Sequence, residues 1–332
     1  MTALPARLRR FLPDPYILAI LAMVALASVE PVRGAAVAPF ALLTKAAIAL
    51  LFFLHGAKLS REAVVAGLTH WRLHLTVLAA TFVLFPLLGL AARALPGAIL
   101  PPTFTAGLLF LCCLPSTVQS SIAFTSVARG NVAAAVCAAS ASNLLGIFIT
   151  PLLVSLVLST HGGGVSLGEL KSVILQLLVP FLAGQIARTW IKDAMARHNR
   201  LVGFVDRGSI LLVVYGAFSA AVAEGLWGQV SIGQIAILIA ACSVLLALVL
   251  IATVLASRAL GFAKEDEITI VFCGSKKSLA SGVPMAGIFF PPASVGVMVL
   301  PLMIFHQIQL MACAFIAQRY AARPLAPLTE TR

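Results

Sequence analysis

The sequence predicts an all-α polytopic membrane protein on three observations. Of the 332 residues, 61% are hydrophobic and only 10% are charged, whereas a soluble domain carries roughly 25% charged residues. Apolar runs of about 20 residues, the length that crosses a bilayer, recur along the whole chain. The lysines and arginines lie in short loops between these runs, as topology signals do. The net charge is +12, but the lysines and arginines form no basic stripe, so no nucleic-acid partner is expected.

Ten membrane spans account for the apolar runs. The first also has features of a signal peptide, but the repeat described below favours a retained span. With ten spans, both termini share one side of the membrane, and that side holds 17 of the 23 lysines and arginines. Such an excess marks the cytoplasmic side, so we expect a multi-pass protein of the cytoplasmic (inner) membrane with both termini in the cytoplasm. The predicted spans are 16–30, 37–57, 73–95, 104–129, 132–158, 168–190, 207–224, 232–258, 266–290 and 294–319.

The chain also divides into two similar halves within one integrated transmembrane domain. Residues 1–160 form the first five-helix repeat and residues 161–332 the second. The fourth span is interrupted at "CLPSTVQSS" (113–121) and the ninth at "CGSKKSLAS" (273–281), 160 residues further on. Because each half has an odd number of spans, the halves must have opposite orientations. The sequence therefore predicts an inverted repeat, which is a common plan of secondary transporters.

The two interruptions are the candidate binding site. Non-helical backbone at membrane depth is tolerated only where it is buried in protein or lines a cavity, and the ends of half-helices can hold ions. A plain kink at Pro115 is the alternative for the first interruption, but polar side chains are dense there. The candidates in and behind this interruption are Ser116, Thr117, Gln119, Ser120, Ser121, Ser140, Ser142 and Asn143.

Two adjacent lysines lie in the second interruption. Lys276 follows the acidic run "KEDE" (264–267) by about nine residues, or roughly 14 Å at 1.5 Å per residue. This depth is near the bilayer centre, where a lysine costs about 2.5–3.5 kcal/mol; snorkelling to the interface is the alternative. All eleven acidic residues fall in loops or at span ends, so we expect a bound anion to neutralise the lysines. The candidates here are Ser275, Lys276, Lys277, Ser278, Ser281, His306 and Gln307, with a packing role as the alternative for His306.

The sequence contains no enzyme motif. It lacks His-Glu-x-x-His, Gly-x-Ser-x-Gly and P-loop patterns. Its six cysteines lie in apolar segments without Cys-x-x-Cys spacing. We therefore expect no enzymatic activity and no cofactor, with Na⁺ or H⁺ left open as a coupling ion.

Four segments carry a resemblance to a known family: "FFLHGAKLS" (52–60), "ARGNVAAAVCAASASNLLGIFITP" (128–151), "GSKKSLASGVP" (274–284) and "PLMIFHQIQL" (301–310). The chain resembles the bile acid:sodium symporter family, in particular its orphan sodium/bile acid cotransporter-like branch. The resemblance implies a panel made of the first two helices of each repeat. It implies a core made of the other three, with helices 4 and 9 broken and crossing.

The same resemblance implies a sodium site, from which this chain departs. Ser121 matches one sodium-site serine, with Asn143 close by, but the neighbouring family asparagine falls on Ile122. Hydroxyl positions fall on Ala135 and Ala139. The family glutamate is absent from the ninth helix, where the amide positions fall near the two lysines. Sodium near Ser121 and Asn143 is thus left open, as is bile acid as the substrate.

We therefore predict a symporter-like secondary active transporter that moves a small organic anion across the bilayer by alternating access. The sodium coupling and the oligomeric state are left open. Two alternatives stand beside this prediction. One is a cation/proton exchanger of similar fold, although it would normally need an acidic residue inside the membrane. The other is a non-transporting membrane regulator.

Overall fold

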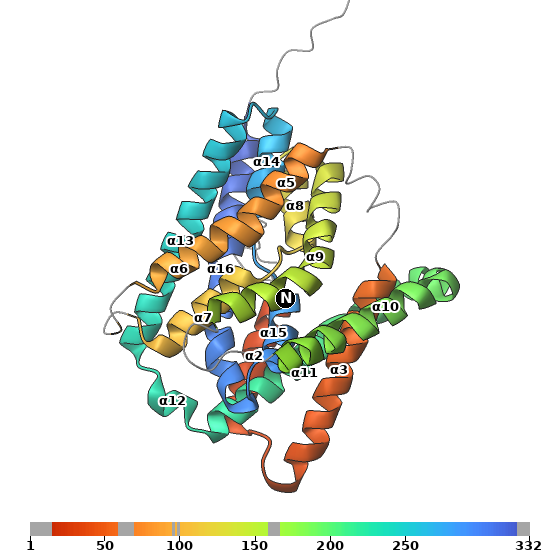
Figure 1. The fold of residues 1–332 in the computed structure, drawn as a ribbon, viewed down its shortest axis with the longest axis vertical. Coiled ribbons are helices and arrows are strands. Elements are labelled where there is room, and N and C mark those ends of the chain that lie inside the picture. Colours follow the sequence, from red (N-terminus) through yellow and green to blue (C-terminus); the bar gives the residue numbers. More distant parts are fainter. Residues whose placement is uncertain (1–14, 59–69, 95–96, 98–99, 159–166, 324–332) are drawn as a thin grey trace, which may run out of the picture. The chain divides into compact units, whose positions relative to one another are not determined.

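The computed structural model describes residues 15–58, 70–94, 97, 100–158 and 167–323. These residues are helical without a strand (Figure 1). The predicted boundary between the halves, at residues 160 and 161, lies outside them. In chain order the helices are α2 (Pro15–Val29), η1 (Gly34–Ala36), α3 (Val37–Lys58), α5 (Trp71–Ala79), η2 (Ala80–Leu84), α6 (Phe85–Ala92), α7 (Pro102–Cys113), α8 (Gln119–Val127), α9 (Val132–Leu158), α10 (Leu167–Arg197), α11 (Asn199–Ala223), α12 (Leu226–Gln229), α13 (Ile232–Ala259), α14 (Lys264–Gly274), α15 (Leu279–Phe289) and α16 (Pro292–Ala321).

The chain forms two compact units, each made of separated segments. The first unit comprises Met1–Lys58, Val179–Gln229 and Ala286–Gly296. Within it, α11 packs against α2 and α3. Glycine permits the close contact between α3 and α10, because a Cβ atom at Gly56 would lie 2.0 Å from the backbone oxygen of Phe181.

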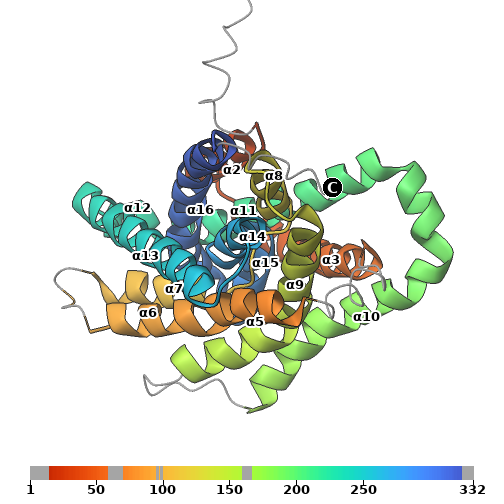
Figure 2. The same ribbon diagram turned by 90° about the horizontal axis from the view of Figure 1, so that it is seen from above.

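The second unit comprises Leu59–Leu178, Val230–Met285 and Val297–Arg332 and contains both interruptions. Helix α14 is its centre, packed against α5, α8, α9 and α13 (Figure 2). Phe272 of α14 also packs against Cys313 and Ala317 of α16. Every residue of α14 from Glu267 to Gly274 is buried. After its charged first turn, α14 continues as the apolar run "ITIVFC" (268–273), and a helical segment that is apolar on nearly all sides belongs in such a central position.

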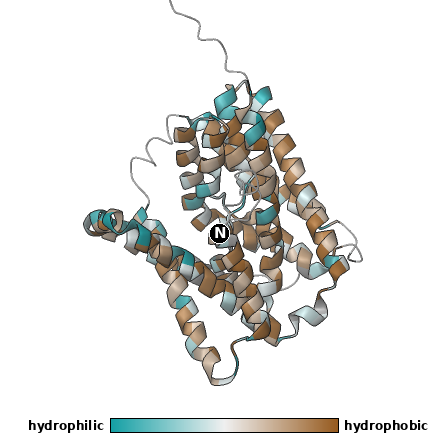
Figure 3. Ribbon diagram, turned by 180° about the vertical axis from the view of Figure 1, so that it is seen from behind, coloured by the Kyte–Doolittle hydropathy of each residue, from teal (hydrophilic) through white to brown (hydrophobic). Residues whose placement is uncertain are grey.

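Several helices have the length and composition of membrane spans. Among the described residues, six helices are long and apolar enough to cross a bilayer: Gly34–Lys58, Trp71–Ala92, Val132–Leu158, Asn199–Ala223, Ile232–Ala259 and Pro292–Ala321. Apolar residues dominate the length of most helices (Figure 3). The interrupted spans fall short of this criterion because α7 and α14 have only 12 and 11 residues, whereas a span needs about 20.

Two helices extend further than the predicted spans. Helix α10 runs to Arg197 and α11 begins at Asn199, whereas the spans were expected to end at residue 190 and to begin at residue 207. The extra turns carry exposed polar and charged side chains, such as Lys192 and Arg200. A search for apolar runs finds only the part of a helix that lies in the membrane. The helix itself continues further, because Ala, Lys, Arg and Met are good helix formers.

Candidate transport site

The two predicted interruptions are present and touch each other. The first break, residues 114–118, separates α7 from α8, and the second break, residues 275–278, separates α14 from α15. The backbone N–H of Ser278 donates to the carbonyl oxygen of Pro115 at 2.9 Å. We call the region where these breaks meet the crossing.

Glycines permit the close packing at the crossing. A Cβ atom at Gly146 of α9 would lie 2.7 Å from the Cβ atom of Pro115. A Cβ atom at Gly282 of α15 would lie 2.4 Å from a methyl carbon of Leu114. Both distances are shorter than side chains allow, so a larger residue would displace the Pro115 ring at Gly146 or the methyl groups of Leu114 at Gly282.

Asn143 of α9 links the two breaks directly. Its Nδ2 donates to the carbonyl oxygen of Ser116 in the first break at 2.9 Å. Its Oδ1 accepts from the hydroxyl of Ser281, at the start of α15, at 2.9 Å. The hydroxyl of Ser278 donates to Ser281 Oγ at 3.1 Å and accepts from the Ser281 N–H, which caps α15. One amide side chain thus joins polar groups that lie 165 residues apart in the sequence.

Hydroxyl groups of the first break and of α8 donate to the last carbonyl oxygens of α14. Ser116 Oγ donates to the carbonyl oxygen of Cys273 at 2.6 Å, and Ser121 Oγ donates to that of Phe272 at 3.1 Å. Ser142 Oγ in turn accepts from the Ser116 N–H at 3.0 Å. The last carbonyls of a helix have no partner inside it, so these hydroxyls have a structural use.

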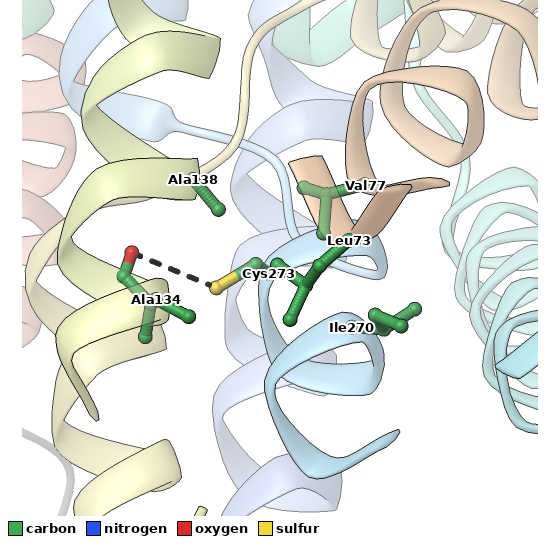
Figure 4. Close-up of a cluster of buried hydrophobic side chains, with 7 residues drawn as sticks. Leu73, Val77, Ala134, Ala138, Ile270 and Cys273 are labelled. Atoms are coloured by element: carbon green, nitrogen blue, oxygen red, sulfur yellow. Dashed lines mark hydrogen bonds between the residues drawn. The ribbon is translucent and has the colours of Figure 1, made fainter. Parts of the chain in front are cut away.

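Cys273 lies at the apolar side of the same helix end. Its side chain packs with Leu73, Val77, Ala138 and Ile270 in a buried cluster (Figure 4). Its thiol also contacts the carbonyl oxygen of Ala135 at 3.9 Å. The crossing is therefore polar on one side of α14 and apolar on the other.

Lys277 is completely buried, and three backbone carbonyls surround its ammonium group. Its Nζ donates to the oxygens of Thr81, Cys112 and Leu114 at 2.8, 2.8 and 2.7 Å. The ring of Phe85 lies 4.1 Å from the same atom. An ammonium has three donors, and each hydrogen bond to a charged group contributes about 1.5–3 kcal/mol. These bonds offset the cost of a lysine at membrane depth, about 2.5–3.5 kcal/mol.

A local change of helix type makes the Thr81 carbonyl available. In segment η2 the helix is a π-helix, and the N–H of Phe85 bonds to Ala80 instead of Thr81. The next donor along the chain would be residue 86, which is a proline without an N–H. Thr81 O therefore lacks a partner in its own helix. The Cys112 carbonyl is free because α7 ends at Cys113, and the negative end of a helix favours a cation.

Lys276 is also completely buried, but its ammonium has fewer polar partners. Its Nζ donates to the carbonyl oxygen of Ser120 at 2.8 Å. The ring centres of Phe124 and Phe272 lie 4.0 and 5.4 Å away. A cation–π contact contributes about 0.5–2 kcal/mol. In this conformation, backbone carbonyls and aromatic rings thus stabilise the ammonium groups of both lysines.

Gln309 of α16 is a residue of the crossing that the candidate set omitted. Its Oε1 accepts from the Lys277 N–H at 2.9 Å, and its Nε2 donates to the Lys277 carbonyl at 3.0 Å. Its Nε2 also lies 2.8 Å from Nδ1 of His306. The sequence could have indicated Gln309, because it is an amide three residues after the candidate His306 and such residues share a helix face.

Three candidates do not take part in this network. The side chain of Gln119 is exposed, and those of Ser140 and Gln307 are half-buried. The hydroxyl of Thr117 lies 2.6 Å from that of Ser120. The hydroxyl of Ser275 donates to Val271 O at 2.6 Å, within its own helix end.

The structure offers no carboxylate at the crossing among the described residues. The closest acidic residue along α14 is Glu267 in its first turn, bonded to Arg258, Lys264 and Tyr320 at 3.2, 2.7 and 2.9 Å. In the described part of the chain, no three His, Cys, Asp or Glu side chains group as a metal site would require. A sodium ion near Ser121 and Asn143 stays a prediction.

Comparison with known proteins decides the family. Residues 14–322 match the model of the SBF-like CPA transporter family. The chain belongs to this family. It is 59% identical to the "Uncharacterized protein PA2026" of Pseudomonas aeruginosa over 95% of both chains. It is 57% identical to the "Putative symporter YfeH" of Escherichia coli K12 over 92% of both. It is 29% identical to "Sodium/bile acid cotransporter 7" of Rattus norvegicus over 92% of this chain and 91% of the relative.

Membership of the SBF-like CPA transporter family confirms the predicted class. The chain is a multi-pass membrane transporter and not an enzyme. It is related to the bile acid:sodium symporters, as the four sequence segments indicated.

In this SBF-like CPA transporter, Asn143→Ala should loosen the crossing. The substitution leaves the Ser116 carbonyl and the Ser281 hydroxyl without their partner, at a cost of about 1–3 kcal/mol for each buried group. We expect a lower thermal unfolding midpoint of the detergent-purified protein. Ser140→Ala, on the same helix, is the matched control and should leave the midpoint unchanged. Equal midpoints for both variants would show that Asn143 does not hold the breaks together.

Proposed function

We propose that this protein is a symporter-like secondary active transporter that moves a small organic anion across the cytoplasmic membrane by alternating access. The observation that carries the proposal is the crossing, where two buried lysines of the second break meet polar groups of η2, α7, α8 and α16. Interrupted helices are where secondary transporters place their substrate and ion sites. The names of the sodium/bile acid cotransporter relatives support the choice of an organic anion.

The two compact units support a core-plus-panel arrangement. The second unit contains both interruptions, and the first contains α2, α3 and α11. We propose that they form the core and the panel of ten transmembrane helices in two inverted repeats, residues 1–160 and 161–332. The distribution of lysines and arginines supports a cytoplasmic location for both termini.

The buried ammonium groups also bear on the coupling ion. Lys277 already places a positive charge among carbonyl oxygens, which are the ligands that sodium prefers. Transport driven by a proton gradient, or uncoupled transport, is therefore favoured over sodium coupling. A cation/proton exchanger is disfavoured because the described residues of the crossing include no carboxylate.

The test is an uptake assay on the full chain in proteoliposomes. A thermal-shift screen of organic acids, with and without sodium, selects the probes, and taurocholate is included because of the relatives' names. We expect at least one anion to raise the unfolding midpoint and to accumulate in the vesicles. Uptake should follow an imposed proton gradient more than a sodium gradient. If no organic acid shifts the midpoint or enters the vesicles, the chain is a regulator or takes another substrate class.

A further inference from the structure

We infer that the two adjacent lysines have different tasks: Lys277 is a fixed internal cation, and Lys276 is the cation that exchanges its protein partner for the substrate anion. The nature of the ligand rests on the proposed function. The difference between the lysines rests on their contacts alone.

The ammonium of Lys277 has no donor left for a ligand. Its three N–H groups match three carbonyl oxygens at 2.7–2.8 Å. Gln309 also holds both backbone groups of this residue. To bind an anion, Lys277 would have to give up one of these bonds and leave a buried carbonyl without a partner.

In the part of the chain that the structure describes, the ammonium of Lys276 is held by one oxygen. That oxygen is the backbone carbonyl of Ser120. Ser120 lies in the first turn of α8, so this carbonyl can also accept the hydrogen bond of the helix. The other contacts are the faces of Phe124 and Phe272, which attract a cation but accept hydrogen bonds poorly. An anionic oxygen would replace these ring contacts with charge-assisted hydrogen bonds, so exchange of partners favours binding.

The residues around the Lys277 ammonium are also more deeply buried than those around the Lys276 ammonium. All the contacts of Lys277 are fully buried: Thr81, Cys112, Leu114 and Phe85 are each 0% exposed. Of the three Lys276 contacts, Phe272 is also fully buried, but Ser120 and Phe124 are half-buried, and Gln119 beside them is exposed. A ligand that displaces the first turn of α8 therefore reaches Lys276 and leaves the shell of Lys277 intact.

Chemical labelling of the intact protein tests this difference without a known substrate. The probe is pyridoxal 5′-phosphate, an anionic aldehyde. Its carbonyl condenses with an amine to an imine and water, and borohydride then reduces the imine to a stable secondary amine. Peptide mass spectrometry locates the modified residue. Lys192, which is exposed in the extension of α10 beyond the predicted span, should react first, Lys276 slowly in the native protein, and Lys277 only after denaturation. Equal rates at the two adjacent lysines, or native Lys276 as inert as Lys277, would overturn the inference.

A matched pair of aromatic variants sharpens the test. Phe124→Ala removes a ring next to Lys276, and Phe85→Ala removes the ring next to Lys277. We expect Phe124→Ala to raise the Lys276 rate several-fold, and Phe85→Ala to leave Lys277 unlabelled because its carbonyl shell remains. Labelling of Lys277 in folded Phe85→Ala would contradict its fixed role. If the labelling differs as expected but no organic anion is transported, the proposed function fails while the distinction between the lysines stands.

Discussion

Lys277→Met should be among the most destabilising single substitutions in the chain. It keeps most of the side-chain volume but removes the group that satisfies Thr81, Cys112 and Leu114. Each buried acceptor left without a partner costs about 1–3 kcal/mol, and loss of the desolvated charge returns about 2.5–3.5 kcal/mol. We expect a net loss of about 3 kcal/mol, measured as a lower midpoint in thermal or denaturant unfolding in detergent.

Lys276→Met is the matched control, because it removes a charge at the next position but frees only one carbonyl, which belongs to a helix. Its midpoint should equal or exceed that of the parent.

A further variant, Lys277→Ala, leaves space among the carbonyls for a small cation. Ammonium chloride or sodium chloride should restore its midpoint more than choline chloride does. Parent-like stability of Lys277→Met, with no cation effect on Lys277→Ala, would refute the fixed-cation role.

Lys276→Met should nearly abolish anion transport in a protein that remains folded. A hydrogen bond from an ammonium to an anionic ligand contributes about 1.5–3 kcal/mol, and each 1.4 kcal/mol is a factor of ten. We therefore expect uptake to fall about 10- to 150-fold in proteoliposomes that contain equal amounts of protein.

Lys276→Arg should also transport poorly, because the planar guanidinium is larger than an ammonium and must fit between Phe124 and Phe272. Ser140→Ala should transport at the parent rate. Parent rates in both Lys276 variants would mean that the lysine is only tolerated at this depth and that the substrate binds elsewhere.

The sequence was most informative about where the helices are interrupted. A proline and a cluster of small polar residues mark the first break, and two lysines inside an apolar run mark the second. Such residues are costly in hydrocarbon, so their presence at matched positions predicts backbone that lies inside the protein. The same reasoning selected Ser116, Ser121, Asn143 and Ser281, which join the two breaks.

The partners of the lysines could not be predicted from residue types. Sequence reasoning looked for carboxylates, found none, and expected an anion. The groups in place are backbone carbonyls, and their availability depends on where α7 ends and on the π-helical segment before Pro86. Backbone acceptors exist at every position in a chain, and only the helix geometry shows which are free. Gln309 was missed because an amide on a long apolar helix gives no sign of which backbone it faces.

The most direct test of the crossing as the transport site is protection of Lys276 from pyridoxal 5′-phosphate by a transported anion. Labelling of Lys276 is measured over a range of anion concentrations in the parent protein, with exposed Lys192 as the internal reference. We expect the anion to protect Lys276 over the same concentration range in which it raises the unfolding midpoint, with Lys192 labelled throughout. Full labelling of Lys276 at saturating anion would contradict a site at the crossing.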